Sequence, residues 1–362
     1  MWLEPPSWPS LFAPVCLASC KAQPEHFCVT ERPLPAAVQA RSLTDSSLPH
    51  RLFEIEKRGL NSVAVAQSLS AWAGVPLAEI GYAGRKDRWA LTRQWFSVPA
   101  SAIAALALND VADQFVRFAA PRFDADASLR VLNQAWQPRK LRIGELLGND
   151  FELTLTLETQ ALPELAIAQA LERFREHGIP NYFGAQRFGR DNLPQAVGWL
   201  QEHQASPQAR RHRARARSRL RRERGWHLST LRAFLFNEVV AARVKHSGGA
   251  RLLTLDGDVL ENGIPSGPLW GRGRSATRGL AAQLEASALA PHADLLAGLE
   301  YAGASQMRRP LLLHPQQTKF VSIDGRTARL SFALPKGAYA TVVLAELFDL
   351  QDASTALIEV AA

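Results

Sequence analysis

One short segment of the chain places a carboxylate among several cations, and it is the segment with the clearest chemical potential. From Gly81 to Trp95 the sequence reads GYAGRKDRWALTRQW, so Asp87 lies directly between Lys86 and Arg88. Nearby cations favour the ionised form of a carboxylic acid because they stabilise its charge. An ionised carboxylate in a basic surface could attack a sugar carbon or remove a sugar proton in bound RNA. The same residues also fit a surface loop in which Asp87 forms only a structural salt bridge.

The charge balance of the chain indicates a polyanionic partner. Lysine and arginine total 42 against 34 aspartates and glutamates, which gives a net charge of +8. Nine of the fifteen residues from Arg210 to Arg224 are arginines, enough to neutralise several phosphates. Charge alone does not choose among DNA, RNA and an anionic membrane. A fully solvated or disordered arm is the alternative for the arginine-rich segment.

The sequence has no clear motif for binding a metal or a cofactor or for spanning a membrane. The three cysteines, Cys16, Cys20 and Cys28, have no second cluster that could complete a zinc site, and their odd number argues against a disulfide framework. The apolar opening from Leu11 to Ala18 is interrupted by Pro14 and has no basic leader. No run approaches the roughly 20 apolar residues that a membrane span requires. We therefore expect a cytoplasmic protein with no metal, no cofactor and no membrane partner.

Apolar periodicity predicts the elements that must position these side chains. Alternation of apolar and polar residues predicts a half-buried strand from Phe151 to Glu158. Asp324-Gly325 predicts a tight hairpin turn with positive φ angles between two of the later strands. The other predicted strands are 53–56, 94–98, 320–323 and 328–334. The predicted helices are 61–73 after an Asn61 cap, 165–177 before Gly178, one that begins after Ser229, and 338–350.

The order of these elements predicts an inserted domain. A chain of 362 residues exceeds a comfortable single core. Its first part mixes strands and helices, its middle is mostly helical and rich in arginine, and its last fifty or so residues return to strands. The closing strands would then complete the sheet of the first domain.

The Asp87 segment resembles the signature of the TruD family of pseudouridine synthases, in which A-G-x-K-D leads into T-x-Q-W. A second family block, K-A-x-P-E-x-F-x-V-x-E, is matched from Lys21 to Glu31 in order and spacing. The resemblance implies that Asp87 is the catalytic residue and that Lys21 is its basic partner. The residues that match the first block are Ala83, Gly84, Lys86, Asp87, Thr92, Gln94 and Trp95.

Further blocks extend the resemblance from position 21 to position 341, although 252–299 aligns poorly. In the family, the aromatic residue of G-N-x-F stacks on the target base, which implies this role for Phe151, with Asn149 at the edge of the base or sugar. Ala338 and Tyr339 depart from the family's Ser and Phe. The blocks are K-L-R-x-G at 140–144, G-N-x-F at 148–151, G-V-P-N-Y-F-G-x-Q-R-F-G at 178–189 with Ile179 for Val, R-R at 308–309, P-Q-Q at 315–317 and L-P-x-G-S-F-A-T at 334–341.

The residues expected to bind substrate also have structural alternatives. Phe27 alternates with Val29 as in an ordinary core strand, and Phe151 could be a core residue at a strand end. The block from Gly178 to Gly189 could stack on RNA and contact phosphate, or could be an interdomain turn with its aromatics packed inward. The expected substrate-binding residues are Phe27, Lys86, Asn149, Phe151 and Arg187.

The resemblance implies an α+β fold with a pseudouridine-synthase-like mixed, mainly antiparallel sheet and flanking helices. This catalytic domain would comprise residues 1–180 and 312–362, with an inserted α/β TRUD domain at 181–311. The implied activity is the isomerisation of uridine to pseudouridine in tRNA, at uridine 13 of the D arm, by a monomer. No electrons are transferred overall, so the reaction needs no redox cofactor.

Two other classes of function compete with this interpretation. A non-catalytic RNA-binding or RNA-chaperone module would keep the basic surface without the chemistry, but the matched set of Lys21, Asp87, Asn149 and Phe151 speaks against it. A glycosidase-type hydrolase would ordinarily need two carboxylates beside the sugar. The matched motifs supply only Asp87 as a catalytic carboxylate.

Overall fold

The structure is a computed structural model that describes residues 7–20, 22–34, 41–42, 44–104, 111–159, 162–189, 191–205, 219–249 and 251–352. For 204–205, 219–222 and 352 it describes the backbone only. The chain divides into two compact units. We call the first the helical unit; it comprises Met1–Pro14, Gln169–His314 and Ala338–Leu347. The second, the sheet unit, comprises Val15–Ala168, Pro315–Gly337 and Phe348–Ala362. The assignment of 181–311 to an inserted TRUD domain stays a prediction.

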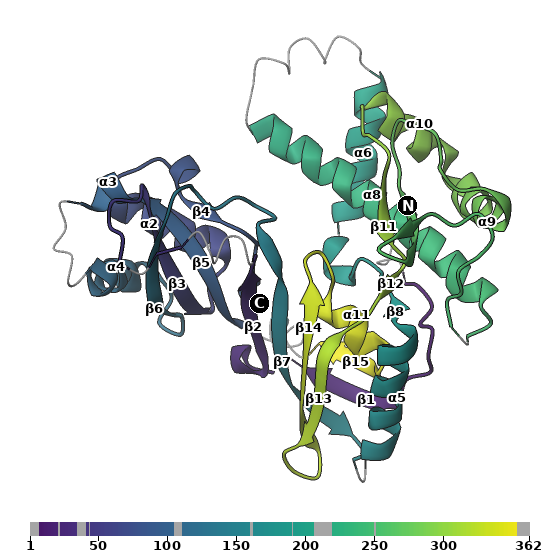
Figure 1. Cartoon of the computed structure of the whole chain (residues 1–362), viewed down its shortest axis with the longest axis horizontal. Helices are drawn as coiled ribbons and strands as arrows, with labels where there is room; N and C mark the ends of the chain where they lie inside the picture. The colour runs from purple at the N-terminus through teal and green to yellow at the C-terminus, as the bar shows by residue number, and fades with distance from the viewer. Residues whose placement is uncertain are drawn as a thin grey trace. The chain divides into compact units, whose positions relative to one another are not determined.

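The sheet unit is built on a ten-stranded mixed sheet, whose main path runs β13-β14-β7-β2-β5-β3-β6 (Figure 1). Most pairings are antiparallel, and β2 with β5 and β1 with β15 are parallel. The fold is therefore α+β with a mainly antiparallel sheet, as predicted. The strands are β1 (Cys16–Cys20), β2 (Phe27–Pro33), β3 (His50–Arg58), β4 (Gly81–Tyr82), β5 (Leu91–Pro99), β6 (Ser128–Gln137), β7 (Leu146–Glu158), β13 (Gln316–Ser322), β14 (Thr327–Pro335) and β15 (Phe348–Asp352).

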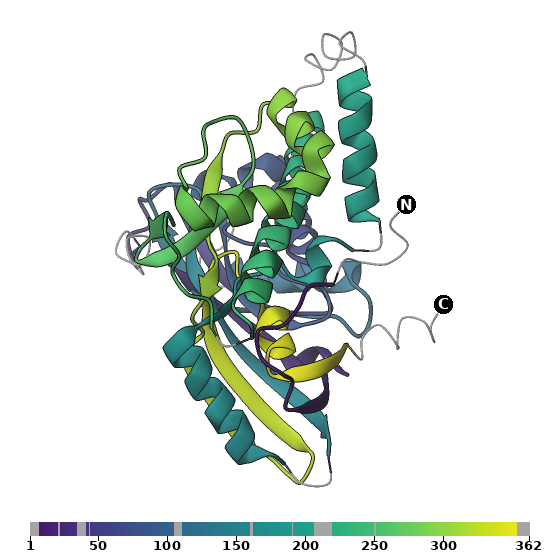
Figure 2. The same ribbon diagram turned by 90° about the vertical axis from the view of Figure 1, so that its right-hand side faces the viewer.

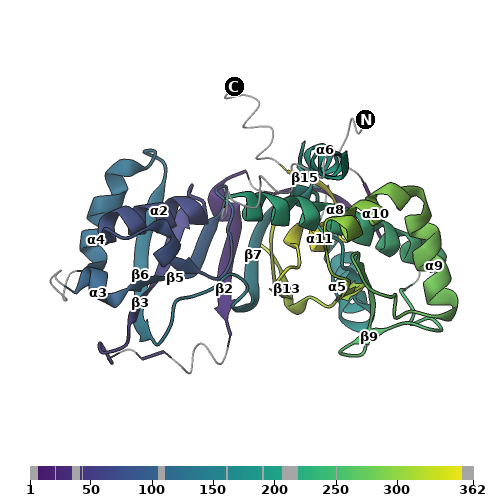
Figure 3. The same cartoon turned by 90° about the horizontal axis from the view of Figure 1, so that it is seen from above.

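Helices cover one face of this sheet at β3, β5 and β6 (Figure 3). Phe53 and Ile55 of β3 are fully buried there against Val65 and Leu69 and against Phe115. Every second residue of a strand faces the same side, which is why the alternation at 53–56 predicted this strand correctly. The helices are α2 (Ser62–Ala73), α3 (Ala100–Ile103), α4 (Val111–Ala119) and the one-turn segments η1 (Pro24–His26), η2 (Leu77–Glu79) and η4 (Ala120–Arg122).

The predicted helix cap at Asn61 is confirmed, whereas the turn geometry predicted for Asp324-Gly325 is wrong. The Asn61 side chain accepts a hydrogen bond from the Ala64 N–H at 2.9 Å and caps α2 as predicted. The hairpin of β13 and β14 also forms (Figure 2), but Gly325 does not adopt a positive φ. The turn is held instead by the Asp324 carboxylate, which accepts from the N–H groups of Arg326 and Thr327 at 2.8 and 2.7 Å.

The helical unit packs several helices with two small sheets, β11-β10-β9 and β12-β8. Its core lies along one long helix, in which Leu231, Leu235 and Val239 are buried as their spacing predicted. The elements are β8 (Ile179–Pro180), η5 (Ala185–Arg187), α6 (Asn192–Ala205), α8 (Arg219–His246), β9 (Leu260–Glu261), β10 (Ile264–Leu269), α9 (Gly279–Leu289), η6 (Ala290–His292), α10 (Ala293–Tyr301), β11 (Met307–Pro310), β12 (Leu312–Leu313) and α11 (Ala340–Ala345); α5 spans Glu164–His177.

Two predicted helix boundaries are wrong. The helix expected to begin after Ser229 begins at Arg219, and it continues through Gly225. The helix expected at 338–350 covers only Ala340–Ala345. The residues that follow Ala345 contact residues near the start of the chain instead. The buried Glu346 carboxylate accepts from the N–H groups of Leu11 and Phe12, and Phe348 pairs with Cys16.

Candidate active site

Asp87 lies on the irregular segment between β4 and β5, and its side chain is exposed. Two side chains that are almost fully buried hold the main chain of this segment by hydrogen bonds. Ser62, at the start of α2, accepts from the Lys86 N–H at 2.8 Å and donates to Gln94 Oε1 at 2.5 Å. Gln94 of β5 in turn donates through Nε2 to the Gly84 carbonyl at 3.0 Å. The backbone around Asp87 is therefore fixed by side chains of the core, while its carboxylate faces outward.

A buried lysine completes this support. The Lys57 side chain, on β3, is 0% exposed, and its Nζ donates to the Asp87 carbonyl at 2.9 Å and to the Leu60 carbonyl. Burial, together with the charge on Lys86, lowers the pKa of Lys57 to about 7, while Asp87 opposes that shift. Sequence reasoning missed Lys57. The signal was present, because Lys57 continues the inward alternation of Phe53 and Ile55.

The cations beside Asp87 in the sequence pair with other carboxylates. Each of three such neighbours has its own partner, because backbone alternation and loop geometry turn them away from Asp87. Lys86, expected at the substrate, is turned inward. The pairs are Lys86 with Glu31 at 3.2 Å, Arg88 with Asp124 at 2.6 Å and Arg93 with Glu56 at 2.8 Å. Burial raises the pKa of Glu31, and Lys86 only partly offsets this effect.

Strand register brings three of the expected residues to the same face of the sheet. In the antiparallel pair of β2 and β7, Glu31 is opposite Asn149 and Val29 is opposite Phe151. Phe27 lies two residues before Val29, so its side chain lies on the same face. This face also carries Glu31, whose carboxylate binds Lys86 of the Asp87 segment. The structure thus places Phe27, Asn149 and Phe151 on the face that the Asp87 segment contacts.

Phe151 is packed rather than free. It is 8% exposed, stacks on Phe332 with ring centroids 5.4 Å apart, and meets Phe27 edge-on at 6.2 Å. One of its ring faces is therefore occupied by the protein. Asn149 is different, because its Oδ1 is buried and has no hydrogen-bond partner among the described residues. A buried acceptor without a partner is costly, which makes this atom a candidate ligand contact.

Arg187 belongs to the helical unit, whereas Asp87 belongs to the sheet unit. It donates to the Ser229 hydroxyl. The rest of its sequence block is largely structural: the Phe183 N–H and carbonyl bond the buried Asn237 side chain at 2.8 and 2.9 Å. Arg309 lies over the Phe183 ring at 4.2 Å. The aromatics of this block thus pack inward, one of the two alternatives that the sequence left open.

Two sequence expectations fall outside what the structure describes. Lys21, expected to pair with Asp87, is not among the described residues, nor are residues 210–218 of the arginine-rich segment. The roles of both stay predictions.

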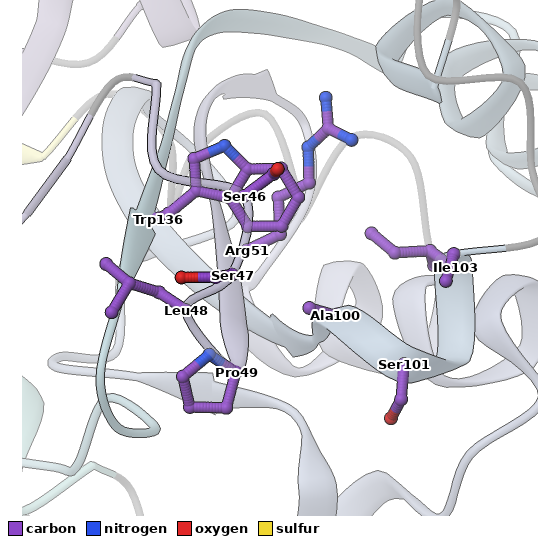
Figure 4. A pocket seen from close by; sticks show the side chains of 10 residues that line it. Ser46, Ser47, Leu48, Pro49, Arg51, Ala100, Ser101, Ile103 and Trp136 are labelled. Carbon is purple, nitrogen blue, oxygen red and sulfur yellow. The ribbon is translucent and has the colours of Figure 1, made fainter.

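Other features of the described residues bear on the kind of site. No group of three His, Cys, Asp or Glu side chains among them could hold a metal ion. None of the helices in the described ranges is both long and apolar enough to cross a membrane. A cavity of about 390 Å³ lies in the sheet unit where β3 begins, with Arg51 beside the Trp136 ring (Figure 4). Asp87 is not among the residues that line it.

Comparison with known proteins decides the family. A family model described as tRNA pseudouridine synthase D (TruD) matches residues 13–199. A protein named tRNA pseudouridine synthase D from Xanthomonas euvesicatoria pv. vesicatoria is 39% identical over 84% of this chain and 86% of that protein. The chain belongs to the TruD family. It is accordingly a pseudouridine synthase, an isomerase.

Further relatives agree with this membership. Proteins of the same name are 36% identical over 97% of this chain and 96% of their own length in Xanthomonas axonopodis pv. citri, and 37% identical over 84% and 80% in Shewanella oneidensis. A crystal structure of a Methanosarcina mazei protein assigned to TruD superposes with a TM-score of 0.62 over 96% of this chain and 97% of that chain, at 19% identity. That structure shows the same fold.

Proposed function

We propose that this TruD family member converts uridine to pseudouridine in tRNA, at uridine 13 of the D arm, and that Asp87 initiates the reaction. The observation that carries the proposal is the geometry of the Asp87 segment. Its main chain is bound at Gly84, Lys86 and Asp87 by buried side chains. Such support is what a reacting group needs, since an error of about 1 Å in its placement can cost about 10²-fold in rate. The relatives' name supplies tRNA as the substrate.

The reaction is an isomerisation that balances without any further reactant. The bond from C1′ to N1 of uridine breaks, the uracil turns, and C1′ joins C5. The hydrogen on C5 is lost and N1 gains one, so the product has the same composition. The Asp87 carboxylate serves either as a nucleophile at C1′ or as the base that removes the 2′ hydrogen.

Asn149 and Phe151 would receive the extruded base. In uridine the base carries one N–H donor, at N3, and Asn149 Oδ1 is an acceptor without a partner among the described residues. Phe151 would contribute the part of its ring that Phe332 and Phe27 leave uncovered. Removing a base from its stack costs a few kcal/mol, and an aromatic contact recovers part of that cost. Lys21 would be the basic partner of Asp87, by family resemblance.

The decisive experiment replaces Asp87 by Asn. Pseudouridine at position 13 of a tRNA transcript is measured by mass spectrometry, and affinity for the same tRNA by fluorescence. We expect Asp87→Asn to lower the single-turnover rate by about 10²–10⁴-fold and to leave the affinity for tRNA within a fewfold of the wild type. The matched control is Asp124→Asn, which makes the same change at an exposed carboxylate of the same unit.

Retained turnover in Asp87→Asn would refute the assignment. A wild-type protein that binds tRNA without forming pseudouridine would instead favour the RNA-binding or RNA-chaperone alternative. Deuterium at C2′ of the target uridine then separates the two routes, because only removal of the 2′ hydrogen gives a primary isotope effect.

A further inference from the structure

Lys57 is a buried cation whose hydrogen bonds go to carbonyl oxygens. Its ammonium group binds the Asp87 and Leu60 carbonyls from inside the sheet. The residues opposite Lys57 in its two neighbouring strands are Thr92 of β5 and Leu129 of β6, neither of which carries charge. Burying an ammonium group costs free energy unless strong acceptors surround it. An apolar side chain would pack at this position without that cost.

The electrostatic surroundings do not explain why a lysine is buried at this position either. Among the residues that the structure describes, Lys86 and Asp87 are the charged groups that act on Lys57. Lys86 repels it, and the carboxylate of Glu31 is engaged by Lys86. The contacts that distinguish Lys57 from a packing residue are therefore its hydrogen bonds to the Leu60 and Asp87 carbonyls, and the second of these reaches the Asp87 segment.

We propose that Lys57 is a positioning residue for pseudouridine formation, which fixes the backbone from which the Asp87 side chain extends by holding the Asp87 carbonyl. The carbonyl and the side chain of one residue share the same Cα, so anchoring the carbonyl restrains the position of this Cα and the direction of its bond to Cβ. A hydrogen bond from an ammonium group is roughly twice as strong as a neutral one. The proposal rests on Asp87 being the catalytic residue.

The pH dependence follows from the same contact. The charged form of Lys57 holds the carbonyl more firmly than the neutral amine. Because burial and Lys86 lower the pKa of Lys57 to about 7, the hold weakens as pH rises through that value. The single-turnover rate of the wild-type enzyme should therefore contain a component that declines above about pH 7. This component should be absent when Lys57 is replaced.

The test compares Lys57→Met with Ile55→Ala, a substitution at a fully buried position of the same strand and the same sheet face. We expect Lys57→Met to lower the single-turnover rate by about 10²-fold, to leave tRNA affinity within twofold, and to remove the pH component. Ile55→Ala should lose activity only in proportion to its unfolded fraction. Lys57→Met that is folded and fully active, or that behaves as Ile55→Ala does, would overturn the proposal.

If Lys57→Met does not fold, the wild-type chain still decides. The ¹³C carbonyl shifts of Asp87 and Leu60 should titrate together with the Lys57 ammonium group in NMR spectra, and the rate should follow the same curve. Carbonyl chemical shifts that do not change as the Lys57 ammonium group titrates would overturn the proposal. Failure of the catalytic assignment is distinguishable, because it appears as an active Asp87→Asn whatever the result at Lys57.

Discussion

Replacing Glu31 by Gln should destabilise the sheet unit strongly, because it leaves the Lys86 ammonium group buried without its counter-ion. The Lys86 Nζ and Glu31 Oε2 are 3.2 Å apart, and the two side chains are only 6% and 2% exposed. Gln keeps the shape of Glu and removes only the charge. Breaking a buried pair in this way costs about 3–5 kcal/mol. For a domain of this size class that corresponds to a fall in Tm of roughly 6–20 °C.

Replacing both partners should behave differently. Burial raises the pKa of Glu31 in spite of Lys86, so the cost of removing the carboxylate from water exceeds what the pair returns. The double variant Glu31→Leu, Lys86→Met has no charge to bury, and such replacements are often neutral or stabilising by about 1–4 kcal/mol. The single substitutions should therefore be strongly non-additive.

Urea unfolding at pH 7 of the wild type, Glu31→Leu, Lys86→Met and the double variant measures the coupling between the two side chains, and Glu31→Gln is measured beside them. Hydrogen exchange of the β2 and β7 amides reports on the sheet unit itself, which matters because a chain of two units need not unfold in one step. A loss below about 1 kcal/mol in Glu31→Gln, within the range of exposed pairs, would refute the argument. So would a double variant as unstable as the sum of its parts.

Two further predictions concern other parts of the chain. Burial raises the pKa of Glu346 to about 7 from an ordinary 4.5, so the folded state binds this proton more tightly than the unfolded state. Its contribution to the free energy of unfolding is present below pH 4.5 and is lost as pH rises to 7, by roughly 2–4 kcal/mol. Glu346→Gln should remove this pH dependence from urea titrations carried out between pH 4.5 and 7. An unchanged pH dependence would contradict the assignment. Gly148→Ala should cost more than about 3 kcal/mol, because its Cβ would lie 2.0 Å from the Leu334 carbonyl oxygen in the paired strand. The Cβ of Gly325→Ala would meet nothing within 4 Å, so this control should change stability by less than about 0.5 kcal/mol. Thermal unfolding of both glycine variants measures the difference, and equal effects would show the reasoning to be wrong.

Patterns that depend on near neighbours could be predicted from the residues. The alternation from Phe151 to Glu158 lies within β7, and Asn61 caps α2. These features follow from strand and helix periodicity and from hydrogen bonds over three residues, which each stretch of sequence carries within itself. The family also follows from short motifs, because their residue types and spacing are linear features of the chain.

What the sequence could not supply is the choice among partners that are far apart along the chain. Lys86 is next to Asp87 in sequence, yet it binds Glu31, 55 residues away. The stretch after Ala345 leaves its helix because Phe348 pairs with Cys16 of β1. Lys57 reaches the Asp87 carbonyl only because β3 and β5 pair in one register. Several cations near Asp87 in the sequence could form an ion pair with its carboxylate. Only the folded sheet determines which of them pair with other carboxylates, since burial and register decide which charges can meet.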